Sequence, residues 1–189
     1  MRHAQVAFEG SGDGDKAHRF RAAALPYLND VYTLARYLLR NPADAEDAAQ
    51  ECYLRAFRHF DTFRGGPIKP WLLAILRNVC RAEYARRGIL ALQSESLDAA
   101  ADCVEGLWNE GDASPEANAL GKLDGETVRR LIAELPDQFR ETIVLREINE
   151  LSYREIADVV GIPVGTVMSR LARGRALLRA AWIAEEKEP

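Results

Sequence analysis

The sequence predicts an all-α protein in which two small helical domains are joined by a flexible acidic linker. Apolar residues recur at the three- and four-residue spacing of a helix face in both halves of the chain, and strand-like alternation is absent. Between these halves, from Gly88 to about Ala117, the periodicity fails and Ala, Gly, Asp, Glu and Ser dominate. Such a segment buries too little apolar surface to fold by itself. We therefore expect a disordered linker over residues 89–117, between domains at 20–88 and 118–183, with tails at 1–19 and 184–189.

The composition fits a globular protein without a membrane anchor. The 189 residues are 48% hydrophobic and 29% charged, and no apolar run reaches the roughly 18 to 20 residues that span a bilayer. The start of the chain has no apolar signal segment, so we expect a cytoplasmic protein. Cys52, Cys80 and Cys103 lack the spacing of a metal site, and the first two fit buried small hydrophobic residues better than redox sensors.

The formal net charge of −4 conceals a segregation of charge along the chain. From Arg64 to Arg87 there are six basic residues and a single acid, Glu83. From Gly88 to Gly121 there are seven acids and no Lys or Arg, and from Pro163 to Ala181 the only charged residues are arginines. Two basic segments therefore flank an acidic one, and local basic patches attract phosphates whatever the net charge.

The first domain is predicted to contain three main helices. One has an apolar face made of Leu28, Val31, Leu34, Ala35, Leu38 and Leu39. Asn41 is suited to cap the next helix and Pro42 to begin it. The apolar face of this second helix consists of Ala45, Ala48, Ala49, Cys52, Tyr53, Ala56, Phe57 and Phe60, and this leaves outward Asp44, Asp47, Gln50, Glu51 and Leu54.

A third helix is predicted from Pro70 to Arg87, after a loop over residues 63–67 that contains two glycines and a proline. Its inward positions are Trp71, Leu72, Ile75, Leu76 and Val79, and its outward ones include Arg77, Asn78 and Arg81. In the second domain the helical pattern returns with Leu120, Leu123, Val128, Leu131, Ile132 and Leu135. It stops at Pro136 and resumes through Phe139, Ile143, Val144 and Ile148.

Residues 152–167 have the pattern of a helix-turn-helix. Ser152 with Glu155 forms a capping box, Ala157 is small where two helices cross, and Gly161 permits the positive φ of the turn. With Val164, Val167 and Leu171 turned inward, the second helix exposes a face suited to the major groove, made of Thr166, Ser169, Arg170 and Arg173. The alternative is a plain helical hairpin with a solvated arginine-rich face.

The surrounding sequence resembles region 4 of the extracytoplasmic-function group of the sigma-70 family. The resemblance runs through residues 135–146, 151–157 and 165–175. The first half is similar to region 2 of the same group, through residues 44–51, Phe63-Arg64-Gly65, Pro70-Trp71-Leu72, Arg77-Asn78 and Arg86-Arg87. The domain that lies between these regions in housekeeping sigma factors is missing, because residues 88–117 are too few. That absence points to this group.

The resemblance implies an alternative sigma factor, which binds core RNA polymerase and promoter DNA and in most members is restrained by an anti-sigma factor. The helix-turn-helix residues would read the minus-35 element. Asp44, Asp47, Gln50, Glu51 and Leu54 would bind polymerase, although they could also form a solvated acidic face. The minus-10 element would be melted and held by Arg64, Lys69, Arg77, Asn78 and Arg81. Ala82 stands where many relatives have an acid, which leaves the minus-10 preference open.

Enzymatic alternatives find little support in the sequence. The three histidines stand apart from any nucleophilic arrangement, and there is no phosphate-binding loop, so neither catalysis nor a cofactor is expected. Two other classes of protein remain as alternatives. One is a free-standing helix-turn-helix repressor, which would bind a palindromic duplex alone, and the other is an adaptor or anti-sigma antagonist. The acidic linker is expected to act as a tether, or else to imitate nucleic acid within polymerase.

Overall fold

The computed structural model describes residues 11–86 and 125–185. All regular secondary structure within these ranges is helical, which confirms the predicted fold class. The predicted acidic linker over residues 89–117 lies outside the described residues, as do Leu120, Leu123 and Cys103. None of the helices in the described ranges is both long and apolar enough to cross a membrane.

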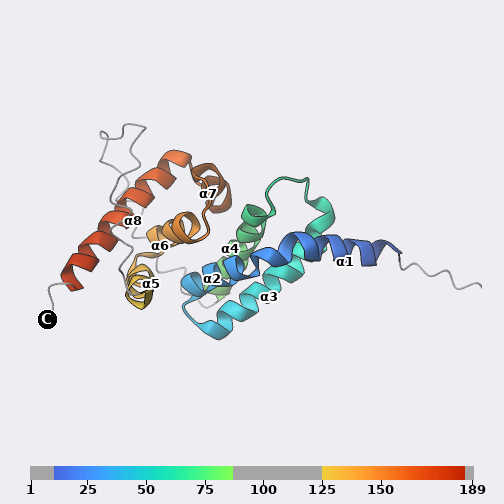
Figure 1. Ribbon diagram of the computed structural model, residues 1–189, viewed down its shortest axis with the longest axis horizontal. Helices are drawn as coiled ribbons and strands as arrows, with labels where there is room; N and C mark the ends of the chain where they lie inside the picture. The colour runs from blue at the N-terminus through green and yellow to red at the C-terminus, as the bar shows by residue number, and fades with distance from the viewer. Residues whose placement is uncertain (1–10, 87–124, 186–189) are drawn as a thin grey trace, which may run out of the picture.

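The first helical domain contains four α-helices, α1 (Ser11–Ala24), α2 (Leu28–Leu39), α3 (Pro42–His59) and α4 (Ile68–Arg86) (Figure 1). Two short 3-10 turns, η1 (Leu25–Tyr27) and η2 (Phe60–Thr62), follow α1 and α3. Helix α2 packs against α3 and α4, and α3 packs against α4. Their shared core includes Val31, Leu34, Cys52, Leu72 and Leu76, all essentially inaccessible to solvent.

Helix α1 begins earlier than the sequence predicts, because residues 11–19 are helical whereas a tail was expected there. The reason is visible at Phe20, which is buried against the aromatic side chains of the first domain. Its ring meets Phe57 and Phe60 edge-on, with centroids 5.4 and 5.3 Å away. This contact anchors a segment whose polar and glycine-rich sequence indicates a loop when it is considered alone.

The start of α3 has the predicted cap. Asn41 is extended, and its side-chain oxygen accepts hydrogen bonds from the backbone N–H groups of Ala43 (2.9 Å) and Asp44 (3.4 Å). Pro42 takes the first helical position, where no N–H donor is required. Helix α2 ends just before this cap at Arg40, which adopts the left-handed conformation with φ 62°. This local chemistry fixes where the chain turns between α2 and α3.

The second domain contains α5 (Gly125–Glu134), α6 (Asp137–Ile143), α7 (Tyr153–Val160) and α8 (Val164–Glu185). Helix α6 continues directly into a π-helical turn, η6 (Val144–Ile148). Helix α8 crosses α6 closely at Gly174: a Cβ placed on this glycine would lie 2.9 Å from Ile143 Cγ1. Only a glycine therefore fits this crossing without movement of its neighbours.

The two domains pack against each other. Helix α7 lies on α4, and α6 lies beside α2 (Figure 1). The buried apolar residues of both domains form one continuous cluster that runs from Phe20 to Leu171. The sequence predicts separately folded domains, and nothing in its local pattern indicates this contact.

Candidate promoter and polymerase interfaces

The helix-turn-helix has the geometry that the sequence predicts. Ser152 Oγ accepts a hydrogen bond from the Glu155 backbone N–H (3.3 Å), while Glu155 Oε2 accepts one from the Ser152 N–H (2.8 Å). Helix α7 ends at Gly161 with φ 74°, and the Gly161 N–H donates to the Ala157 carbonyl (2.8 Å). The capping box and the glycine turn are thereby confirmed.

Helix α8 is attached to the rest of its domain by Val167 and Leu171, which are buried as predicted. Ser169 is exposed, whereas Thr166, Arg170 and Arg173 are half-buried beside it. Ser169 Oγ donates to the Thr166 carbonyl oxygen (3.0 Å). The four predicted minus-35 residues thus all lie within the first three turns of α8.

Two apolar residues on this helix differ from the sequence-based interpretation. Val164 is exposed although it was expected to face inward, because it is the first residue of α8 and precedes the turn that packs on α7. Met168 is 43% exposed and adjoins Ser169. Nothing in the local sequence indicates this exposure, since a methionine in a helix is usually a core residue. Its exposure places an apolar group beside the predicted minus-35 residues.

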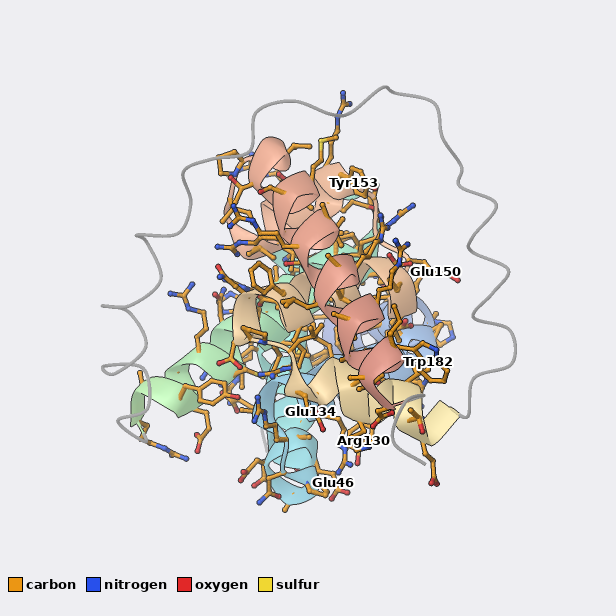
Figure 2. The ribbon with its side chains drawn as sticks, turned by 90° about the vertical axis from the view of Figure 1, so that its left-hand side faces the viewer. Glu46, Arg130, Glu134, Glu150, Tyr153 and Trp182 are labelled. Carbon is orange, nitrogen blue, oxygen red and sulfur yellow. The ribbon has the colours of Figure 1, made fainter. Side chains whose placement is uncertain are left out.

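Contacts within the second domain hold this face in place. The Arg175 guanidinium pairs with Glu147 at 2.7 Å and so ties α8 to the π-helical turn. The Arg146 guanidinium donates to the Leu151 carbonyl (2.9 Å) and lies over the ring of Tyr153, which marks the start of α7 in Figure 2. These contacts join η6, the loop before α7, and α8 into one unit.

The predicted polymerase-binding residues gather on α3. Asp47, Gln50 and Leu54 are exposed, with Leu54 at 53%, while Asp44 and Glu51 are half-buried. Glu51 pairs with Arg55 at 2.6 Å. The phase of the helix therefore places an exposed leucine among acids and an amide, as the sequence predicts.

A shallow apolar hollow of about 540 Å³ adjoins this face, between α2 and α3. Its lining includes Leu28, Tyr32, Ala49, Gln50 and Tyr53, so Gln50 belongs to both features. Leu28 is also largely exposed. The sequence predicts a core position for Leu28 because it continues the apolar spacing of α2. Its position at the first residue of α2 leaves it at the edge of that core.

The five predicted minus-10 residues separate into two groups. Arg64, Asn78 and Arg81 are exposed. Lys69 instead pairs with Asp30 of α2 at 2.7 Å, and Arg77 pairs with Glu141 of α6 at 2.7 Å. Arg77 is therefore not turned to solvent, because the second domain lies over it.

The two cysteines of the described residues are buried, as predicted. Burial raises the pKa of both the Cys52 and the Cys80 thiol to about 12, so both stay protonated at physiological pH. No cluster of three or more His, Cys, Asp or Glu residues able to hold a metal ion occurs within the described ranges.

Comparison with known proteins identifies the family. Residues 24–89 match the family model for sigma-70 region 2, and residues 125–178 match the one for sigma-70, region 4. The ECF RNA polymerase sigma factor SigW of Bacillus subtilis is 34% identical over 159 residues, which cover 81% of this chain and 83% of SigW. The chain belongs to the extracytoplasmic-function group of sigma factors. Sigma factors are transcription initiation factors, so membership confirms the prediction of a non-enzymatic protein.

Other members of the ECF group are similar to this sigma factor. The ECF sigma-E factor of Escherichia coli K12 is 32% identical over 180 residues, covering 90% of each chain. SigE of Mycolicibacterium smegmatis is 33% identical over 174 residues, 92% of this chain and 65% of that longer relative. In the solved structures, the sigma factor RpoE in complex with the anti-sigma factor NepR from Bartonella quintana superposes with a TM-score of 0.65 at 26% identity. That match covers 86% of this chain and 95% of RpoE.

Proposed function

We propose that this sigma factor binds core RNA polymerase and directs it to specific promoters, with region 2 at the minus-10 element and region 4 at the minus-35 element. The proposal rests on the capped helix-turn-helix, whose second helix presents Ser169, Met168 and the adjoining arginines. The same chain displays the α3 face, which consists of Asp44, Asp47, Gln50, Glu51 and Leu54. A sequence reader and a polymerase-binding surface are both required of such a factor.

In region 4, the start of α8 enters the major groove. Thr166 and Ser169 are short enough to let the backbone approach the bases, and Arg170 and Arg173 donate to guanine or to phosphate. Met168 supplies an apolar contact suited to a thymine methyl group. Phosphate contacts set the register, whereas base contacts give the preference for one sequence.

In region 2, Arg64, Lys69, Arg77, Asn78 and Arg81 bind the melted strand of the minus-10 element. Extracting a base from the duplex costs a few kcal/mol of stacking, which contacts to the base and its neighbouring phosphates offset. Arg64 lies in the loop before α4, and Asn78 and Arg81 lie on the exposed face of that helix. An amide among arginines supplies both donors and an acceptor to an unpaired base.

The α3 face of Asp44, Asp47, Gln50, Glu51 and Leu54 binds core polymerase, and the protein acts in the cytoplasm, where polymerase and chromosome meet. Its acids and amide steer a basic partner, and Leu54 supplies a central apolar anchor. We also infer restraint by an anti-sigma factor, because the similar RpoE of Bartonella quintana was solved in complex with one.

The polymerase interface is tested by combining Asp47→Lys with Leu54→Ala. Both side chains are exposed, so the thermal midpoint should move by no more than about 2 °C while co-purification with core polymerase is lost. The matched control is Asp15→Lys, which reverses an exposed acid on α1 that pairs with Arg19 one turn along the helix. If the double variant co-purifies with core polymerase as the wild type does, the interface lies elsewhere.

A further inference from the structure

Helix α1 contacts the turn that leads into the minus-10 loop, residues 63–67, which carries Arg64 (Figure 1). Lys16 Nζ of α1 lies 2.6 Å from Asp61 Oδ2 of η2, two residues before this loop begins. The same ammonium group lies 5.1 Å from the centre of the Phe57 ring. The Lys16 side chain is only 16% exposed, although that of Asp61 is 60% exposed. A covered ammonium group that meets both a carboxylate and an aromatic face is held more firmly than one end of a surface ion pair.

Aromatic side chains extend this contact to the segments on both sides of the minus-10 loop. Phe20 of α1 meets Phe60 of η2 edge-on, with ring centroids 5.3 Å apart. Phe60 is stacked almost parallel to Phe63, the first residue of the loop, at 6.4 Å. Phe63 in turn contacts Trp71 of α4 at 5.0 Å, and its N–H donates to the Phe60 carbonyl (3.1 Å). A row of rings therefore joins α1 to the segments that flank the loop.

Two consecutive glycines form the tip of the minus-10 loop. Gly65 and Gly66 have positive φ, 88° and 98°, a conformation that residues with a Cβ rarely adopt. A Cβ placed on either glycine would meet nothing within 4 Å, so the tip packs against no neighbour at these residues. Arg64 beside them is exposed. The position of the loop is therefore set at its ends, and a loop fixed there binds its ligand with less loss of conformational entropy.

We propose that Lys16 is a positioning residue for the minus-10 loop: through Asp61 it holds the start of the loop in the conformation that presents Arg64 to the melted strand. This role rests on the proposed function, in which Arg64 binds that strand. Lys16 itself need not touch DNA, because its charge already meets Asp61 and the Phe57 ring. Without Lys16 the loop would hold the binding conformation for only part of the time, so the apparent affinity for the strand would fall by that fraction.

The two partners carry opposite charges, which separates positioning from electrostatic attraction. Removing Lys16 takes away a positive charge near the DNA, so attraction and positioning both predict weaker binding. Asp61→Asn instead takes away a negative charge while it keeps the shape of the side chain. Attraction alone predicts tighter binding by this variant, whereas positioning predicts weaker binding because the hold on the loop is lost.

The first test measures strand binding by the holoenzyme. A fluorescent single strand carries the non-template minus-10 sequence of the promoter upstream of the protein's own gene, and a strand of scrambled order measures nonspecific binding. Lys16→Met and Asp61→Asn should each weaken binding of the minus-10 strand by about three- to tenfold, the range for one partly covered ion pair with a cation–π contact. The double variant should bind no more weakly than either single one, because both remove the same interaction. Lys16→Arg, which keeps the positive charge, should bind as the wild type does.

Arg19→Met is the matched control. Arg19 lies on the same helix, is 59% exposed and pairs with Asp15 one turn before it at 3.0 Å. Its loss removes the same charge as Lys16→Met without a change in the partner of Asp61, so strand binding should change by less than about twofold. Binding of a minus-35 duplex, which uses region 4, should be the same in all variants. Their thermal midpoints should lie within about 2 °C of the wild type.

The second test examines the loop without DNA. Exposed loop tips are preferred sites of proteolytic cleavage, and the bond between Arg64 and Gly65 is a trypsin site within the loop. Cleavage after Arg64, identified by mass spectrometry, should be faster in Lys16→Met and Asp61→Asn than in the wild type or Arg19→Met. Weaker strand binding by Lys16→Met with unchanged cleavage would assign Lys16 to direct contact with DNA and overturn the positioning role.

The outcomes separate this role from the proposed function. If both single variants bind the strand as the wild type does, or if Asp61→Asn binds more tightly, Lys16 does not position the loop. The proposed function still stands in that case, provided that wild-type holoenzyme prefers the minus-10 strand to the scrambled one. If the wild type shows no such preference, the proposed role of region 2 fails whatever the variants do. A Lys16→Met variant that loses its helical circular dichroism is replaced by the exchanged pair Lys16→Asp with Asp61→Lys, whose failure to restore wild-type binding would equally overturn the positioning role.

Discussion

Arg140 shows how one buried side chain organises region 4. Its guanidinium is 1% exposed and donates to the Ala133 carbonyl (3.0 Å) and to the Leu135 carbonyl (2.7 Å) at the end of α5. It also pairs with Asp137 at the start of α6. The side chain therefore closes the turn around Pro136, where the last carbonyls of α5 have no partner within the helix.

Replacing Arg140 with alanine should destabilise region 4 by about 3 to 5 kcal/mol, because the carbonyls of Ala133 and Leu135 lose their buried charged donor. Arg130→Ala is the control, since the exposed Arg130 pairs with exposed Glu134 and half-buried Glu185 and should contribute at most about 1 kcal/mol. Chemical denaturation followed by circular dichroism measures both. Equal effects would show that Arg140 has no special structural role.

The buried thiols predict how stability responds to alkaline pH. Burial raises the pKa of Cys52 and Cys80 to about 12 from a reference of 9.0, so the unfolded chain loses these protons first as the pH rises. The free energy of unfolding should therefore be unaffected by these thiols below about pH 8 and should fall between about pH 9 and pH 12. Burial also raises the pKa of Tyr53, which adds to the fall at higher pH.

Urea denaturation from about pH 8 to about pH 10.5 measures this fall. The double variant Cys52→Ala with Cys80→Ala lacks the thiols and should show a shallower decline over the same range. An identical pH dependence in the two proteins would contradict the assignment to the cysteines.

Among elements, those with local signals were predictable and those that depend on distant partners were not. Three of these signals make their hydrogen bonds or turns within four residues of the chain, so their roles could be predicted from sequence: the Asn41-Pro42 helix start, the capping box of Ser152 and Glu155, and the turn at Gly161. Helix α1 depends on Phe20 meeting α3 and η2, a contact without a local signature. The close crossing of α6 and α8 depends likewise on Gly174, and a glycine inside a helix gives no indication of its neighbour.

Gly174→Ala should destabilise region 4 by about 1 to 3 kcal/mol, because the new methyl group would press on Ile143. Gly165→Ala is the matched control on the same helix, where a Cβ meets nothing within 4 Å. That substitution should be neutral or stabilising by up to about 1 kcal/mol. Thermal unfolding distinguishes them, and equal midpoints would refute the close-crossing interpretation.

At the level of the whole molecule, segregated charge predicts the nucleic-acid partner better than the net charge of −4 does. The helical domains, the helix-turn-helix and the exposed α3 face were predictable because each follows from periodicity and capping. The contact between domains was not, since its hydrogen bonds join residues 64 and 119 positions apart. Because of that contact, Arg77 pairs with Glu141 of α6 and is not turned to solvent as the sequence predicts. The roles proposed for the acidic segment at 89–117 stay predictions.

Run-off transcription tests the central claim most directly. Purified core polymerase is supplied with this sigma factor and a template that carries the promoter upstream of its own gene. The wild type should yield a discrete transcript, and Arg170→Ala with Arg173→Ala, checked for intact helicity, should weaken promoter binding by about 1 to 3 kcal/mol for each arginine that reads a base. A transcript that does not depend on the sigma factor, or one that the double variant produces unchanged, would contradict the account.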